Sequence, residues 1–239
     1  MLPLNQVSLI IPTYNRQEIV FKTLQSITGQ SISGFEVIIV DQTIEKDTNL
    51  ENFNNDIFEY KYLIIRETGL PNARNVGAEN AKGDILIFID DDSIPDSNLV
   101  QSYMDLFKSA DQEIWCFGGK VIEKNTDMFK ENESIVGGWI TWYGKTLKNF
   151  VSDESGDCEW AAGGNFAVKR SKFLDISGFD KNFIGNAMLE DGDFGYTIRE
   201  NGGKIWYSPM PAIEHLRIST GGTRSDSASK GMYLSLIHI

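Results

Sequence analysis

Three consecutive aspartates, Asp90, Asp91 and Asp92, directly follow the apolar run at residues 85–89. In an extended segment Asp90 and Asp92 point to one side of the chain and Asp91 points to the other. Carboxylate oxygens suit Mg²⁺ or Mn²⁺, which bind substrate phosphates at the same time. One aspartate could cap the helix expected near Ser97, but three exceed that need. We therefore predict a divalent-cation site at this point of the chain.

Further polar residues follow two other apolar runs. Residues 12–16 (Pro-Thr-Tyr-Asn-Arg) end the run at 7–12, and Asp41 ends the run at 36–41. Open α/β sheets bind ligands outside the carboxyl ends of their strands, so these side chains and the aspartates are expected at one edge of a sheet. The turn at 12–16 has no glycine, whereas a dinucleotide-binding unit has G-x-G-x-x-G there. NAD binding is therefore not expected, and a cation is expected to hold the phosphates of the ligand.

The elements that position these residues alternate between strands and helices in the first half of the chain. Short apolar, β-branched runs, typical of strands covered on both faces, predict strands at 7–12, 36–41, 60–67 and 84–90. Apolar residues between 19 and 27 form a helical stripe, and 71–83 reads as a helix with Pro near its start and Gly at its end. Such alternation favours a parallel sheet built from βαβ units.

The second half is less regular. A helix is expected near 97–108, strands near 114–122 and 204–209, and irregular structure at 123–160. We find no internal repeat, low-complexity tract or linker in the sequence. The expected fold class is a single α/β domain with a mixed, mainly parallel sheet flanked by helices.

The composition limits the partners of the chain. Its 34 acidic residues outnumber its 22 basic ones, and the formal net charge is −12. Nucleic-acid binding and polybasic attachment to membranes are not expected, because both need a basic surface. The sequence has no transmembrane stretch and no signal peptide, so a cytoplasmic protein is expected. Cys116 and Cys158 form no zinc pattern and are expected to be partly buried thiols. The apolar ending at 231–239 suggests a truncated C terminus.

Seven segments together resemble a family 2 glycosyltransferase, in the order of that family and over nearly the whole chain. They are IIPTYNR (10–16), VIIVDQT (37–43), GLPNARNVG (69–77), FIDDDSIP (88–95), GGNFAVKRS (163–171), GFD (178–180) and LEDGDFGYTIRENG (189–202). The resemblance implies the GT-A fold, with a Rossmann-like nucleotide-sugar-binding half at 1–110 and an acceptor-binding half at 111–239.

The same resemblance implies an activity. It is the metal-dependent, inverting transfer of a sugar from a nucleotide diphosphate sugar, most often a UDP-sugar, to a glycan or a lipid-linked glycan. The resemblance also implies a cytoplasmic enzyme, and peripheral association with the inner face of the membrane is compatible with it. The oligomeric state stays open.

Site residues are carried over from the family one position at a time. The residues that match nucleotide-sugar contacts are Pro12, Thr13, Tyr14, Asn15, Arg16, Asp41, Arg74, Asp90 and Asp91. Asp41 matches the aspartate that hydrogen-bonds the base, typically uracil, although Gln42 and Thr43 follow it where the family often has a second acid or amide and then Gly-Ser. For Arg74, an exposed helix arginine is an equally open interpretation.

Glu190 and Asp191 match the acidic pair that opens a helix beside the acceptor. The resemblance implies that Asp191 is the general base and that Glu190 supports it, because a sugar hydroxyl is a poor nucleophile until its proton is accepted. The alternative role of this pair is to complement the helix dipole.

The remaining matches concern the metal and the other substrate groups. Asp92, Asp90 and His215 are the implied ligands of Mn²⁺ or Mg²⁺, with His215 expected just after the last strand. The implied acceptor or diphosphate contacts are Trp160, Gly164, Asn165, Arg217 and Arg224. We expect the segment 216–226 to close over the diphosphate. Each has a structural alternative: aromatic residues are more often core, the glycines could form a tight turn, and His215 could be a satisfied histidine.

Two other classes of protein remain as alternatives. Aspartate-nucleophile phosphatases also place Asp-x-Asp after an apolar strand, but Ile94 stands where such an enzyme would have Thr or Val. Residues 12–16 would also have no role in a phosphatase. A nucleotide-sugar-binding module without catalysis would not need Glu190 and Asp191.

Overall fold

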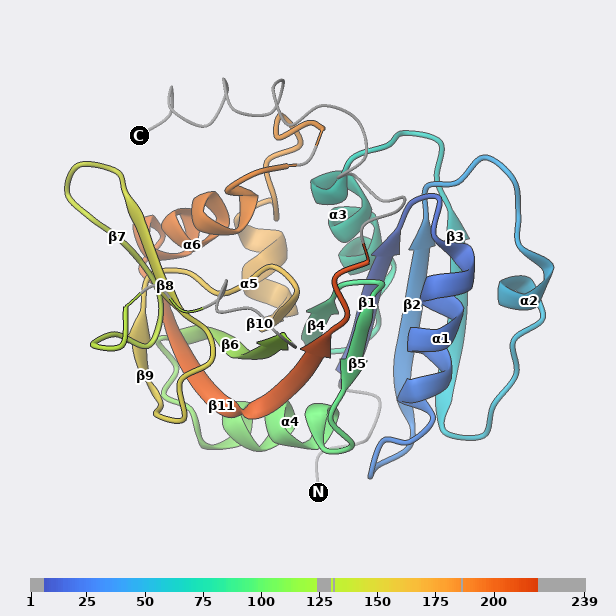
Figure 1. The fold of residues 1–239 in the computed structure, drawn as a ribbon, viewed down its shortest axis with the longest axis horizontal. Coiled ribbons are helices and arrows are strands. Elements are labelled where there is room, and N and C mark those ends of the chain that lie inside the picture. The colour runs from blue at the N-terminus through green and yellow to red at the C-terminus, as the bar shows by residue number, and fades with distance from the viewer. Residues whose placement is uncertain (1–6, 124–129, 131, 186, 219–239) are drawn as a thin grey trace.

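The computed structural model describes residues 7–123, 130, 132–185 and 187–218 of the chain. Helices and strands alternate in the first half, and strands dominate the second (Figure 1). Their bounds are β1 Val7–Thr13, α1 Gln17–Ile27, β2 Phe35–Asp41, α2 Thr48–Glu51, β3 Phe58–Ile64, α3 Leu70–Asn80, β4 Ile85–Ile89, β5 Ser93–Pro95, α4 Leu99–Ser109, β6 Ile114–Glu123, β7 Gly137–Ile140, β8 Thr146–Asn149, β9 Gly156–Cys158, β10 Asn165–Lys169, α5 Arg170–Asp175, α6 Glu190–Glu200 and β11 Lys204–His215.

One nine-stranded sheet runs through both halves of the sequence. Its order is β3-β2-β1-β4-β10-β6-β11-β5, and β9 pairs with β11 off this path. The first four strands are parallel, β10 is antiparallel to both of its neighbours, and β6 is parallel to β11. This is the mixed, mainly parallel α/β sheet that the sequence predicts.

The apolar runs of the first half become strands covered on both faces. Every residue of β1, β2 and β4 is buried. Helix α3 packs closely on β1 and β2. A Cβ at Gly77 would lie only 2.4 Å from Ile10 Cγ2, so only glycine fits at this contact. This covering fixes the carboxyl ends of the strands, where the polar residues lie.

A cluster of phenylalanines holds the second half against the first. It joins β4, β10, α5 and α6 through Phe88, Phe166, Phe173, Phe179 and Phe194, with ring centroids 4.4 Å apart for the closest pair, Phe179 and Phe194. The cluster anchors α6 against the sheet and so positions its first turn, which carries Glu190 and Asp191.

The structure corrects two expectations about the second half. The last strand continues to His215 instead of ending near 209, with a shift of register between Tyr207 and Ala212. The stretch 123–160, expected to be irregular, contains the β7–β8 hairpin and β9. Within the described ranges, none of the helices has the length and apolar character needed to cross a membrane.

Candidate active site

A cavity of ≈350 Å³ opens where the carboxyl ends of β1 and β4 meet the start of α6. It brings together residues that are far apart in the sequence. The predicted site residues that line it are Pro12, Thr13, Tyr14, Arg16, Arg74, Asp90, Asp91, Asp92, Trp160, Gly164, Glu190, Asp191 and His215.

Asp91 has different partners from Asp90 and Asp92, and residues from other elements offset the repulsion among the three carboxylates. Asp91 accepts hydrogen bonds from Thr13 Oγ1 (2.8 Å) and Arg16 Nη1 (3.0 Å). Burial raises the pKa of Asp91 to about 6, although Arg16 and Thr13 act in the opposite direction. The side chain of Asp91 therefore fixes the turn after β1, with one donor on each of its carboxylate oxygens.

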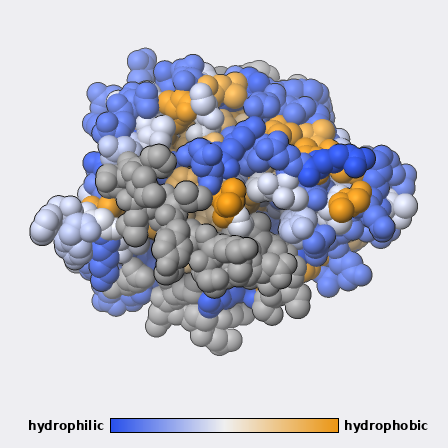
Figure 2. Space-filling model, turned by 90° about the horizontal axis from the view of Figure 1, so that it is seen from above, coloured by the Kyte–Doolittle hydropathy of each residue, from blue (hydrophilic) through white to orange (hydrophobic). Residues whose placement is uncertain are grey.

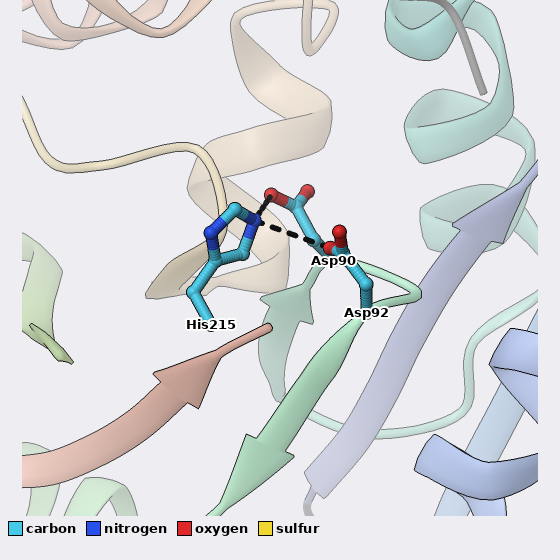
Figure 3. Close-up of side chains that lie close together, drawn as sticks. All are labelled: Asp90, Asp92 and His215. Atoms are coloured by element: carbon cyan, nitrogen blue, oxygen red, sulfur yellow. Dashed lines mark ion pairs between the residues drawn. The ribbon is translucent and has the colours of Figure 1, made fainter. Parts of the chain in front are cut away.

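Asp90 and Asp92 face His215, as Figure 3 shows. His215 Nε2 lies 3.1 Å from Asp92 Oδ1 and 3.7 Å from Asp90 Oδ2. One ligand atom from each of the three residues lies within 4.8 Å of the others, a spacing that one cation could bridge. Among the described residues, the buried Asp92 Oδ1 accepts no hydrogen bond. An atom of this kind fits a metal ligand, because burying it without a partner is costly.

The other ring nitrogen of His215 supports the same interpretation. Nδ1 lies 3.0 Å from Glu123 Oε1, and since a carboxylate only accepts, Nδ1 donates. In a neutral ring this tautomer presents the Nε2 lone pair towards Asp90 and Asp92, where it can bind a cation, and metal-binding histidines are commonly oriented by such a carboxylate. Burial lowers the pKa of His215, but Asp92, Asp90 and Glu123 outweigh it and raise the pKa. Burial alone would raise the pKa of Asp92, yet His215, the Ile218 N–H and Arg16 lower it to about 2.

Arg74 links the aspartates to the first turn of α6. Its Nη1 donates to Glu190 Oε1 at 2.7 Å and its Nη2 to the Gly163 carbonyl at 2.8 Å, while Asp90 Oδ1 lies 3.8 Å from Nη2. The guanidinium also lies over the Phe179 ring, 5.0 Å from its centroid. Arg74 is thus buried between the two acidic groups and is not the exposed helix arginine of the alternative interpretation.

Glu190 and Asp191 form a second acidic group in the cavity. Asp191 accepts from the Gly163 N–H (3.1 Å) and the Gly192 N–H (2.9 Å) and is partly exposed to the cavity. Burial, followed by the charge of Asp191, raises the pKa of Glu190, and burial raises that of Asp191 despite its hydrogen bonds. The two carboxyls together therefore retain a proton more readily than isolated ones.

The backbone before this pair is strained. Leu189, the N-cap of α6, has φ 69°, and Ala187 has φ 47°. A left-handed conformation costs a residue with a Cβ roughly 1–2 kcal/mol, and such strain clusters at functional sites. Both residues line the cavity next to Glu190.

Four predicted site residues do not line the cavity. Asn165 is fully buried and bonds Tyr103 Oη, the Lys120 carbonyl and the Pro211 carbonyl, so the expected substrate contact is wrong. Asn15 is exposed beside the cavity, and its N–H donates to Thr43 Oγ1. Arg217 points to Glu123, with Nη1 3.7 Å from Oε2. The fourth residue is Asp41.

Asp41 is fully buried at the end of β2. Its carboxylate accepts from Gln17 Nε2 (2.8 Å), Tyr62 Oη (2.7 Å) and the Thr43 N–H (2.8 Å). These partners occupy both oxygens, so in this structure Asp41 holds the loop after β2 instead of facing a base. Arg224, most of the expected closing segment and the apolar ending lie outside the described residues.

The cavity also contains residues that the sequence did not single out. Lys148, from β8, and Phe150, just after it, line the cavity. Gln42, Met188 and Leu189 also line it. Gln42 alone carried a signal, because it directly follows the strand that ends at Asp41.

Comparisons with known proteins agree with this geometry. Residues 8–177 match the family model described as Glycosyl transferase family 2. A relative from Campylobacter jejuni, named GalNAc(5)-diNAcBac-PP-undecaprenol beta-1,3-glucosyltransferase, is 28% identical over 187 residues, which cover 76% of this chain and 57% of the relative.

Solved structures share the fold at low sequence identity. GalNAc-T7 with UDP, GalNAc and Mn²⁺ gives a TM-score of 0.69 at 22% identity, covering 90% of this chain and 44% of that one. The mannosyltransferase PcManGT from Pyrobaculum calidifontis with GDP-Man and Mn²⁺ gives 0.65 at 18% identity, covering 87% and 56%. The fold is therefore GT-A, and the chain spans about half the length of these proteins.

Proposed function

The chain belongs to glycosyl transferase family 2, and from this membership we propose that it transfers a sugar from a nucleoside diphosphate sugar to a hydroxyl of a glycan or lipid-linked glycan. The observation that carries the proposal is the pair of acidic groups in one cavity, Asp90–Asp92–His215 and Glu190–Asp191, linked by Arg74. A phosphatase would need only the first group. Family membership also argues against that alternative.

The first group fits a divalent cation. Asp92 Oδ1, Asp90 Oδ2 and His215 Nε2 would hold it, and two carboxylates with an imidazole suit Mn²⁺ better than Mg²⁺. When bound, such an ion supplies positive charge that stabilises a departing diphosphate. The chain's own contribution is to hold these ligands ready: Glu123 contacts His215 Nδ1, and Arg16 Nη1 lies 3.5 Å from Asp92 Oδ2.

The second group would supply the base. We assign this role to Asp191, which faces the cavity and has a raised pKa. It accepts the proton of the acceptor hydroxyl while the new bond to the anomeric carbon forms and the bond to the diphosphate oxygen breaks. One such displacement inverts the anomeric centre. Arg74 positions Glu190 beside Asp191 and keeps the acidic pair from turning away.

The two sides of the cavity would receive different substrates. Residues from 1–110, among them Pro12, Tyr14 and Arg16, would bind the nucleotide, and residues from 111–239, among them Trp160, would face the acceptor. UDP is the favoured nucleotide, since it accompanies GalNAc-T7, although PcManGT carries GDP-Man. The named acceptor of the C. jejuni relative is lipid-linked, which favours such an acceptor and work at the cytoplasmic face of a membrane.

Replacement of the base separates catalysis from binding. Asp191→Asn keeps the shape of the side chain and should slow release of nucleoside diphosphate from a panel of nucleotide sugars with Mn²⁺ by roughly 10²-fold. Its calorimetric affinity for the nucleoside diphosphate should stay unchanged. Asp193→Asn, two residues along the same helix, is the matched control and should turn over normally. Near-normal turnover of Asp191→Asn would contradict the assignment.

A further inference from the structure

An aromatic pair projects from the molecule at the turn of the β7–β8 hairpin. Trp142 is 95% exposed and Tyr143 62% exposed. Their ring centroids lie 5.4 Å apart at 84°, so the two rings form one edge-to-face unit. Neither ring lines the cavity. Trp and Tyr of this kind, with an apolar ring and a polar N–H or O–H, are enriched where a protein meets a membrane–water interface.

The turn that carries the pair is hydrogen-bonded and defined. Thr141 N–H donates to the Lys145 carbonyl (2.8 Å), and Gly144 N–H donates to the Thr141 carbonyl (2.9 Å). Gly144 has φ 82°, a conformation that glycine adopts without strain. The exposure of the two rings is therefore a property of the folded hairpin.

The charge of this region differs from that of the whole chain. Residues 134–152 contain no Asp or Glu but include Lys145 and Lys148, in a chain with a net charge of −12. The segment 181–189 also has no acidic residue and begins with Lys181. Two segments far apart in the sequence are thus locally positive on an acidic protein.

The second segment connects the region to the active site. Ile184 is 58% exposed, while Met188 and Leu189 line the cavity just before Glu190. The hairpin turn and this segment lie on the same upper side of the molecule in Figure 1. Figure 2 looks onto that side, and the hairpin turn stands out at its left edge as a pale lobe. An object that rests on both would lie next to the cavity.

We propose that residues 141–145 and 181–185 form a contact surface for an anionic lipid bilayer, with the Trp142–Tyr143 rings in the headgroup layer. The lysines favour the anionic surface, and the two exposed rings supply apolar area that the headgroup layer can bury. The proposal rests on the proposed function in one respect, the lipid-linked acceptor, whose hydroxyl would reach Asp191 from the bilayer side.

Vesicle co-sedimentation of the protein tests the proposal. Vesicles of phosphatidylcholine with roughly 30% phosphatidylglycerol have a strongly anionic surface and should bind the protein. Vesicles of phosphatidylcholine alone, which are neutral, should bind it less. Trp142→Ser with Tyr143→Ser should weaken binding by about tenfold or more. Lys145→Ala should weaken it by about fivefold, and this loss should disappear at high salt.

The matched control is Ile44→Ser, since Ile44 is 91% exposed but belongs to the loop after β2. It should leave vesicle binding unchanged. Absence of binding to anionic vesicles, or equal loss in the control, would overturn the proposal. Dimerisation through the hairpin in place of vesicle binding would also overturn the proposal. The same holds for a loss of affinity for soluble glycans in the Trp142 variant. Vesicle binding is measured without nucleotide or Mn²⁺, so a failure of the proposed transferase function would show separately, as absent nucleotide binding.

Discussion

Replacing Arg74 by methionine should destabilise the folded protein, because it leaves the buried carboxylate of Glu190 without its partner and not because it creates a cavity. Methionine fills much of the same space but leaves Glu190 without the guanidinium that lies 2.7 Å from its carboxylate. Both side chains are buried, with relative exposures of 2% and 9%. The partner charge therefore has little access to water.

The size of the effect follows from this burial. Removal of one partner of a buried ion pair costs about 3–5 kcal/mol, whereas neutral replacement of both partners is often close to neutral. Arg74→Met should lower the free energy of unfolding by at most that amount at pH 8, because Arg74 lowers the pKa of Glu190 and its loss lets the carboxyl take up a proton. The loss should be smaller at pH 5, because burial and Asp191 already raise the pKa of Glu190 and the carboxyl can take up a proton. Adding Glu190→Gln should restore stability to within about 1–2 kcal/mol of the parent.

Urea unfolding followed by circular dichroism measures these differences. The matched control is Lys82→Met, which breaks the exposed pair with Glu59 (2.9 Å) and should change stability little. If Arg74→Met were as mild as the control, or if Glu190→Gln deepened the loss instead of relieving it, the assigned role of the pair would be wrong.

Two further predictions concern pH and the metal ligands. Because the folded protein raises the pKa of Glu190 to about 8 from 4.5, its contribution to stability is present below about pH 4.5 and lost as pH rises towards 8. The urea midpoint should therefore decrease less between pH 5 and 8 in Glu190→Gln than in the parent protein. An equal decrease in both proteins would argue against the raised pKa of Glu190. Gly164→Ala should weaken Mn²⁺ binding by about tenfold, because its Cβ would lie 2.6 Å from Asp90 Oδ2 and must displace that carboxylate. Calorimetry should show no such loss for Gly192→Ala, whose Cβ would meet nothing within 4 Å.

Local signals in the sequence predicted the sheet, and the resemblance to family 2 glycosyltransferases supplied the site residues, most of which line the cavity. Continuous apolar runs predicted β1, β2 and β4, because strands buried on both faces need such runs. The alternation around Asp91 predicted that Asp90 and Asp92 would share a face, and both meet His215. Here the local pattern and the tertiary structure agree.

Partners supplied by the tertiary fold were not predictable. Arg74 and Glu190 are 116 residues apart, and Asn75 and Phe179, which also bond, are 104 apart. No local pattern reports such a pairing. Asn165 was misassigned for the same reason, since a polar residue after two glycines does not reveal three internal hydrogen-bond partners.

Two strand predictions failed for a different reason. Pro209 and Pro211 lack an N–H and argue against a strand, yet they lie in the irregular register between Tyr207 and Ala212, where no ladder bond is lost. The β7–β8 hairpin was not recognised because its strands have four residues each, GGWI and TLKN, with too few apolar residues to show an alternating pattern. The two prolines are also the reason why the sequence did not predict that β11 continues to His215.

The central claim is that the cavity binds a divalent cation and a nucleoside diphosphate together. Calorimetric titration of UDP, and of GDP, with and without Mn²⁺ tests it most directly. We predict that Mn²⁺ tightens the affinity for one of these nucleotides by about tenfold or more, and that Asp92→Asn abolishes this gain while the protein remains folded. Equal nucleotide affinity with and without Mn²⁺ in the parent protein would contradict the account.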